Sequence, residues 1–203
     1  MLREAWLSPG GDRQYVTYSG NPDGPVLLDL HGGPGYSDEP LLRAGLFDRL
    51  REHVLFVTWD QRGAGRSFSE HTDPGTMTLE RIVADGVHVA AALCRSFDRD
   101  RIHLMGHSWG GFLGMHLIQA RPDLFHGLFA IAPFVSLARM EPVADDFIRE
   151  EARAQGNAEV LRRIEAEGPP PYEDGIAAQG VRAQCLLPLG GMIRGGAKRA
   201  KAF

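Results

Sequence analysis

Two glycines on either side of Ser108 constrain this chain more than any other feature. Ser108 lies at the centre of a Gly-His-Ser-Trp-Gly stretch, residues 106–110, which follows a short apolar run at 102–105 and precedes apolar residues at helical spacing. Where a strand turns tightly into a helix, the positions two before and two after the turn residue approach so closely that a Cβ would clash. Gly106 and Gly110 meet that requirement. The pattern therefore predicts a strand, a sharp turn and a helix, with the Ser108 hydroxyl exposed as a candidate nucleophile.

A Gly-x-Ser-x-Gly string also occurs by chance, so a glycine-rich turn without chemistry is the alternative for this stretch. The segment His31-Gly32-Gly33-Pro34-Gly35, directly after the buried-strand pattern at 26–30, favours the chemical interpretation. Two consecutive glycines let the backbone approach a ligand and turn its N–H groups toward it, and Pro34 stiffens the exit at a position where a cis peptide bond can occur.

Acyl transfer requires such donors, because two backbone N–H groups must face the oxygen that becomes anionic in the tetrahedral intermediate. We expect one donor from Trp109, just after the serine, and the other from Gly32 or Gly33. His31 is expected to hydrogen-bond within its own loop. The indole ring of Trp109 is expected to pack at the wall of the pocket.

A third segment, Trp-Asp-Gln-Arg-Gly-Ala-Gly-Arg-Ser at residues 59–67, follows another strand-like run. It lacks the third glycine of a dinucleotide-binding fingerprint. We expect Asp60 and Arg62 to pair with each other and hold this loop beside residues 31–35, without a catalytic role.

Together, the motifs at 31–35, 60–67 and 106–111 resemble those of the proline iminopeptidase branch of the α/β-hydrolase fold. The resemblance extends over about residues 10–195, with the specific motifs confined to 31–67 and 106–111. It implies a cytoplasmic serine peptidase that releases an N-terminal residue, often proline, from short peptides without a metal or cofactor. The same scaffold supports esterases, amidases and lactonases, so the fold does not determine the substrate. Members that use an aspartate nucleophile are disfavoured by Ser108.

The resemblance also implies a triad in the order serine, aspartate, histidine. The last two histidines of the sequence are His116, within the helix after Ser108, and His126, in an expected turn after that helix. Neither position matches the family's catalytic histidine, and the aspartate loop after the seventh strand is missing too. We therefore expect the chain to lack the triad's aspartate and histidine and to be nearly inactive alone. A non-catalytic relative that binds a peptide or a partner protein is the alternative.

Strand patterns alternate with helical ones, which predicts an α/β fold with a mostly parallel sheet. Strands are expected at residues 2–7, 14–18, 26–30, 54–59, 102–105 and 128–132, and helices near 40–52, 78–97 and 109–120. We assign residues 1–137 to an incomplete α/β-hydrolase core, and 138–203 to a helical cap segment and tail. The strand-like run at 185–187 is interpreted as the last cap helix. The last two strands of the fold are expected to be missing.

The cap segment is rich in carboxylates. A solvated acidic face explains most of them, and Glu150 and Glu151 are the candidates for binding a substrate's α-ammonium group. A net charge of −4 favours neither nucleic acid nor an anionic membrane as a partner. We expect a small peptide, amide or ester as substrate, no metal site, and free thiols at the two cysteines. We further expect the apolar sixth strand to be an exposed edge through which the chain forms homo-oligomers or aggregates.

Overall fold

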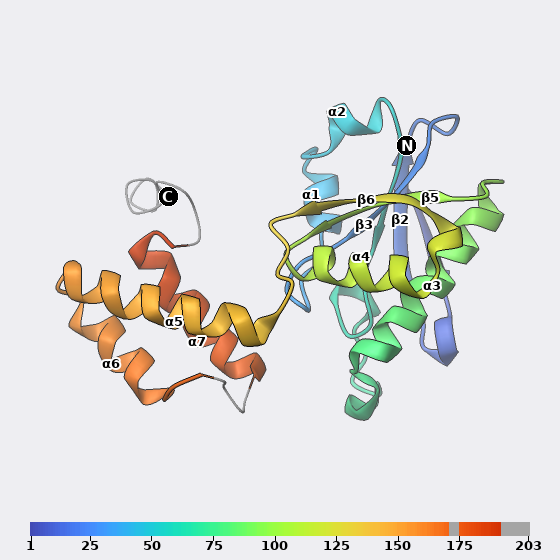
Figure 1. Ribbon diagram of the computed structural model, residues 1–203. Helices are drawn as coiled ribbons and strands as arrows, with labels where there is room; N and C mark the ends of the chain where they lie inside the picture. Colours follow the sequence, from blue (N-terminus) through green and yellow to red (C-terminus); the bar gives the residue numbers. More distant parts are fainter. Residues whose placement is uncertain (171–174, 192–203) are drawn as a thin grey trace. The chain divides into compact units, whose positions relative to one another are not determined.

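Strand-forming segments at regular intervals build one sheet within the first of two units of the chain. The computed structural model describes residues 1–170 and 175–191, and it divides the chain into Met1–Phe134 and Val135–Phe203. In the described part, the sheet of the first unit has six strands (Figure 1). They are β1 (Arg3–Leu7), β2 (Gln14–Gly20), β3 (Val26–Leu30), β4 (Leu55–Trp59), β5 (Ile102–His107) and β6 (Phe125–Ile131).

The strand order is β1-β2-β4-β3-β5-β6. The first two strands form an antiparallel pair, and β2 is antiparallel to β4, whereas β4, β3, β5 and β6 run parallel to one another. In the parallel part, Leu30 pairs with both Trp59 and Gly106. The carboxyl ends of β3, β4 and β5 therefore lie at one edge of the sheet, which is where ligands bind in open α/β sheets.

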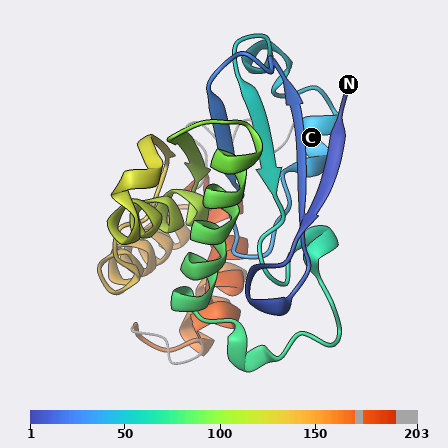
Figure 2. The same ribbon diagram turned by 90° about the vertical axis from the view of Figure 1, so that its right-hand side faces the viewer.

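Helices cover both faces of the sheet. The longer helices, α3 (Leu79–Ser96) and α4 (Trp109–Ala120), pack against one face through apolar residues such as Val89 and Leu113. Two short helices, α1 (Glu39–Arg43) and α2 (Asp48–Arg51), cover part of the other face, where Leu42 and Phe56 belong to a smaller apolar cluster. Figure 2 shows α3 running along the twisted sheet.

The structure confirms the expected mostly parallel sheet, with two local differences. The helix expected near 40–52 is two short helices, because Gly45 adopts a positive φ of 84° between them. β6 begins at Phe125, three residues earlier than expected, so His126 lies within a strand and not in a turn. A β-bulge between Ile102 and His103 accommodates this longer pairing.

The second unit is helical in its described part. It contains α5 (Leu137–Ala154), α6 (Ala158–Ala166) and α7 (Gly175–Leu189), so the run at 185–187 is helical, as expected. Asn157 begins α6 with a side-chain cap, accepting a hydrogen bond from the backbone N–H of Val160. The small core of this unit contains Ile148, Ala152, Val160, Ile164, Cys185 and Leu189. Across the described residues, no helix has both the length and the hydropathy of a membrane span.

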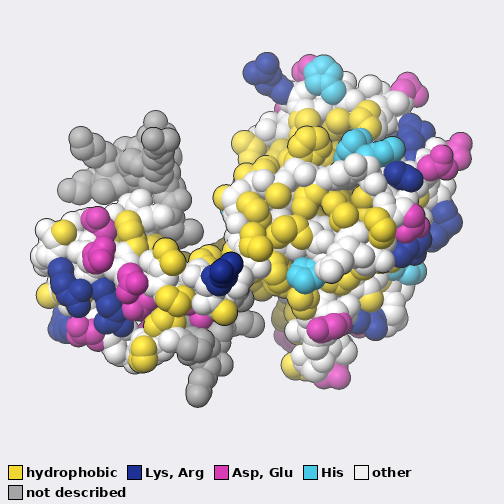
Figure 3. All heavy atoms as spheres, viewed as in Figure 1, with side chains coloured by type: hydrophobic (Ala, Val, Ile, Leu, Met, Phe, Trp, Pro, Cys, Tyr) yellow, Lys and Arg dark blue, Asp and Glu magenta, His cyan; other side chains and the backbone are white. Residues whose placement is uncertain are grey.

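The face of β6 opposite α4 is open. Leu128 packs toward α4 beside Gly114, whereas Phe129 and Ile131 point to the other side and are 59% and 47% exposed. In the described part of the chain, β6 has β5 as its one neighbour in the sheet. Hydrophobic side chains also gather on the surface of the first unit in Figure 3. An apolar edge of this kind favours association with a second chain.

We expect the 203-residue chain to self-associate at tens of micromolar and the Phe129→Lys variant to be more nearly monomeric, because a charge blunts an exposed edge. Sedimentation velocity measures the difference. Phe68→Lys is the matched control, since Phe68 is 62% exposed and belongs to no strand of the sheet. A monomeric wild type at this concentration would contradict the expectation.

Candidate active site

Ser108 lies in a backbone conformation that few residues other than glycine adopt. It follows the last residue of β5 and precedes the first residue of α4, with φ 54° and ψ −116°. Its N–H donates to the Ile131 carbonyl at 2.9 Å, and its own carbonyl accepts from Phe112 at 3.2 Å. A strained conformation of this kind costs on the order of 1–3 kcal/mol, and it persists because the neighbouring structure enforces it.

The expected strand, turn and helix are therefore present, and the surrounding glycines show why. A Cβ on Gly106 would overlap the backbone of Gly110, and a Cβ on Gly110 would overlap the carbonyl oxygen of Leu30. These contacts seat the start of α4 directly on the end of β3. The side chain of Ser108 is half-buried.

The loop after β3 lies against the same turn. A Cβ on Gly32 would lie 3.7 Å from the Cβ of Ser108 and 3.3 Å from Nδ1 of His107. Gly33 has φ 116°, and its peptide bond to Pro34 is cis. Gly35, also with a positive φ of 102°, continues the turn. The structure thus brings the 31–35 loop into contact range of Ser108, as the sequence indicates.

His31 is held as a neutral ring. Its Nε2 accepts from the backbone N–H of Gln61 at 3.0 Å, which leaves Nδ1 as the protonated nitrogen, and Nδ1 donates to the Gly32 carbonyl at 2.9 Å. Burial lowers the pKa of His31 below its usual range, since the ring is 1% exposed. Both nitrogens are occupied, so His31 is a structural residue of the loop and not a base for Ser108.

The expected pair between Asp60 and Arg62 is not formed among the described residues. Asp60 instead accepts from the Ser37 hydroxyl at 2.5 Å and from the backbone N–H of Arg66 at 2.8 Å. The side chain of Arg62 leaves the loop in another direction and binds Asp85 of α3 through two hydrogen bonds, at 2.7 and 3.0 Å.

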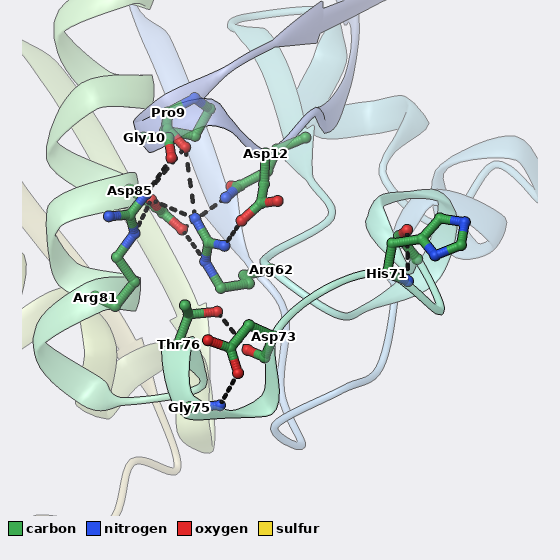
Figure 4. Close-up of polar contacts among 12 residues, drawn as sticks. Pro9, Gly10, Asp12, Arg62, His71, Asp73, Gly75, Thr76, Arg81 and Asp85 are labelled. Carbon is green, nitrogen blue, oxygen red and sulfur yellow. Dashed lines mark hydrogen bonds and ion pairs between the residues drawn. The ribbon is translucent and has the colours of Figure 1, made fainter.

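Arg62 also contacts Asp12 and the carbonyl of Pro9, so it joins the turn after β1 to α3 (Figure 4). The guanidinium is nearly inaccessible to water. A buried cation requires such partners, and Asp85 and Asp12 supply them. Arg62 therefore joins the 60–67 loop to α3 and not to Asp60, and the absence of a catalytic role for this loop stays a prediction.

Gln61, between these two residues, is a site neighbour that the sequence reasoning missed. Its side-chain amide donates to the His31 carbonyl at 3.1 Å and accepts from the indole N–H of Trp109 at 2.8 Å. The Trp109 ring also lies near the rings of Phe112 and Phe134, with centroids 5.6 and 6.4 Å away. The Asp-Gln-Arg motif was visible in the sequence, but the partners of its glutamine were not.

Two further histidines pack against aromatic rings, and two carboxylates of the cap segment lie at or near the surface of the second unit. His116 packs edge-on against Phe112, and His126 stacks on His103. In the second unit, Glu150 is exposed and Glu151 accepts from the Gln155 amide. Binding of a substrate amine by Glu150 or Glu151 stays a prediction.

A buried and a half-buried carboxyl group lie at the base of the 31–35 loop. Asp29, in β3, is 3% exposed, and Asp38 precedes α1 just beyond the loop. Burial, and then the charge and hydrogen bond of the Asp38 carboxyl, raise the pKa of Asp29 well above its usual range. A protonated Asp29 can donate to the Asp38 carboxyl, and such a bond would join the two ends of the loop.

Comparison with known proteins gives consistent similarities. A family model described as the alpha/beta hydrolase fold matches residues 25–165. A probable aminopeptidase of Bacillus subtilis, YbaC, is 33% identical over 171 residues, covering 84% of this chain and 54% of the relative. A probable proline iminopeptidase of Streptomyces coelicolor is 32% identical over 174 residues, covering 81% and 49%. The chain thus spans about half the length of these curated relatives.

Among solved structures, the proline iminopeptidase-related protein of Thermus thermophilus matches with a TM-score of 0.62 and 26% identity. The match covers 93% of this chain and 60% of that one. The proline iminopeptidase of Mycobacterium smegmatis has a TM-score of 0.58 at 21% identity, covering 90% and 67%, and shows likeness of fold.

We expect Gly110→Ala to lower the stability of the first unit by about 3 kcal/mol or more, and Tm by roughly 10 °C, because the new methyl group meets the rigid Leu30 carbonyl. Thermal unfolding followed by circular dichroism measures this. Gly127→Ala is the matched control, since a Cβ at Gly127 meets nothing within 4 Å. Equal Tm values for the two variants would show that the close contact is absent.

We expect Asp29→Asn to be more stable than the wild type at pH 7 by about 1–3 kcal/mol. The pKa of Asp29 is raised in the folded state, so as pH rises above about 4 the unfolded chain loses this proton while the folded chain keeps it. The free energy of unfolding of the wild type therefore falls as pH rises until the folded state also loses the proton. Asparagine is neutral throughout and can still donate to Asp38.

Urea unfolding between about pH 3 and pH 8 tests this expectation, and the advantage of Asp29→Asn should disappear toward the acid end. Asp23→Asn is the control, because Asp23 is exposed. A constant difference between Asp29→Asn and wild type over the whole range would refute the proposed protonation.

Proposed function

This chain belongs to the α/β-hydrolase fold family, and from that premise we propose that it is a hydrolase of the proline iminopeptidase type, with Ser108 as nucleophile. The proposal rests above all on the contact between the glycine loop and the serine turn. Gly32 lies beside Ser108, and Trp109 begins a helix whose first N–H groups have no partner within the helix. The glycine loop and the start of α4, which can both supply backbone N–H donors, therefore lie next to the Ser108 hydroxyl. The similarity to named aminopeptidases and proline iminopeptidases supports the choice of substrate class.

In the proposed reaction, the Ser108 hydroxyl attacks the carbonyl that follows the N-terminal residue of a short peptide. The carbonyl oxygen becomes anionic and accepts from the N–H of Trp109 and from an N–H of Gly32 or Gly33. Collapse of the intermediate releases the shortened peptide, and water then hydrolyses the acyl-enzyme.

Attack by serine also requires a base to take the hydroxyl proton. His31 has no free nitrogen for this purpose. Among the described residues no hydrogen bond to the Ser108 hydroxyl is present, and that observation favours a second candidate function, binding of a peptide or partner protein without hydrolysis. Added imidazole can take the proton in place of a side chain, and this makes the two candidates distinguishable.

We expect a fluorophosphonate probe to label Ser108 slowly in buffer and at least about tenfold faster with imidazole, because in this proposal the backbone donors stabilise the oxyanion and imidazole serves as the base. Mass spectrometry of the labelled peptide locates the adduct. Ser108→Ala should abolish labelling, whereas Ser69→Ala, at an exposed loop serine, should not. Labelling that imidazole does not accelerate would favour the binding protein.

Hydrolysis of small substrates, measured in the same imidazole-containing buffer, tests the substrate class. Proline naphthylamide should react faster than its N-acetylated form, because an aminopeptidase requires a free α-ammonium group. Equal rates, or a preference for simple esters, would indicate an esterase or amidase of this fold.

A further inference from the structure

We propose that Gln61 is a positioning residue that fixes the distance between the two sources of oxyanion donors. Its backbone and side chain make three hydrogen bonds: N–H to His31 Nε2, amide nitrogen to the His31 carbonyl, and amide oxygen from the indole of Trp109. The inference rests on the proposed function, because it assigns Gln61 to the same oxyanion site.

Two of the three bonds go to His31 and the third to Trp109, so they join two parts of that site. His31 begins the loop that contains Gly32 and Gly33, and Trp109 contributes the backbone N–H next to Ser108. Gln61 is therefore a bridge between the end of β3 and the start of α4, which are separate segments of the chain. The side chain is 2% exposed, so water does not compete for its bonds.

The bond to His31 Nε2 also orients the glycine loop. With Nε2 occupied as an acceptor, Nδ1 carries the proton and holds the Gly32 carbonyl toward the ring. In a trans peptide the C=O and the following N–H point in opposite directions, so the N–H of Gly33 is held away from the ring. Gln61 thus sets the direction of a loop donor as well as its distance.

Gln61 itself is held from both sides. Asp60 binds Ser37 at the end of the glycine loop, and Arg62 binds Asp85 of α3. The neighbouring residues therefore fix the backbone of Gln61, and its amide transmits that position to His31 and Trp109. A carboxamide of this length both donates and accepts at every pH, whereas methionine and ionised glutamate have no side-chain donor.

The test compares the imidazole-supported labelling of Ser108 in wild type, Gln61→Met and Gln61→Glu. We expect Gln61→Met to lower the maximal labelling rate about 10- to 100-fold and to leave the half-saturating probe concentration nearly unchanged, because misplaced donors act on the transition state. The indole N–H resonance of Trp109, assigned with Trp109→Phe, should shift and exchange faster with solvent. Gln119→Met, on the exposed face of α4, is the matched control.

Gln61→Glu supplies a readout that a purely structural role would not alter. A protonated glutamic acid can donate to the His31 carbonyl and accept from the Trp109 indole, whereas an ionised one cannot donate. The labelling rate of Gln61→Glu relative to wild type should therefore rise as pH falls. If Gln61→Met fails to fold, the pH dependence of labelling in Gln61→Glu still tests the positioning role.

The outcomes separate this inference from the function on which it rests. If wild type labels at Ser108 and the folded Gln61 variants label equally fast at every pH, the positioning role is overturned and the proposed function stands. If wild type does not label even with imidazole, both are overturned.

Discussion

The close approach of Gly110 to the Leu30 carbonyl is the contact on which the rest of the site depends. It fixes the first turn of α4 against the carboxyl end of β3, so the serine turn and the glycine loop cannot separate. The positive φ of Ser108 follows from the same contact, because the chain must reverse from strand to helix within one residue. Backbone packing of this kind involves no flexible side chain. The geometry around the hydroxyl is therefore set by folding and needs no ligand.

Much of this arrangement was predictable from the sequence because its causes are local. Gly106 and Gly110 are required by the turn whatever lies around it, and the run at 26–30 is apolar almost throughout because β3 is buried on both faces. The start of β6 was missed because His126 is exposed and Gly127 lowers strand propensity. There the pairing with β5 overrides the local signal.

The partners of the Asp60–Arg62 segment could not be predicted, and the reason is physical. Side chains two positions apart leave an irregular loop in different directions, so closeness in sequence does not indicate a pair. Arg62 meets Asp85, which is 23 positions away on α3, and Asp85 also accepts from the amide of Gln14 at 2.6 Å. Gln14 in turn accepts from the indole of Trp59 at 2.7 Å. Only the packing of α3 on the sheet brings these groups together, and no short motif encodes that packing.

Two hydrogen-bonded groups of residues thus meet at the Asp60–Arg62 segment, one buried under α3 and one at the serine turn. The first satisfies the buried guanidinium of Arg62, which would otherwise oppose folding strongly. The second holds His31 neutral, and burial reinforces this by lowering the pKa of its ring. With His31 neutral, the 31–35 loop presents backbone dipoles and no charged side chain beside Ser108, which is the electrostatic setting that the proposed oxyanion site requires.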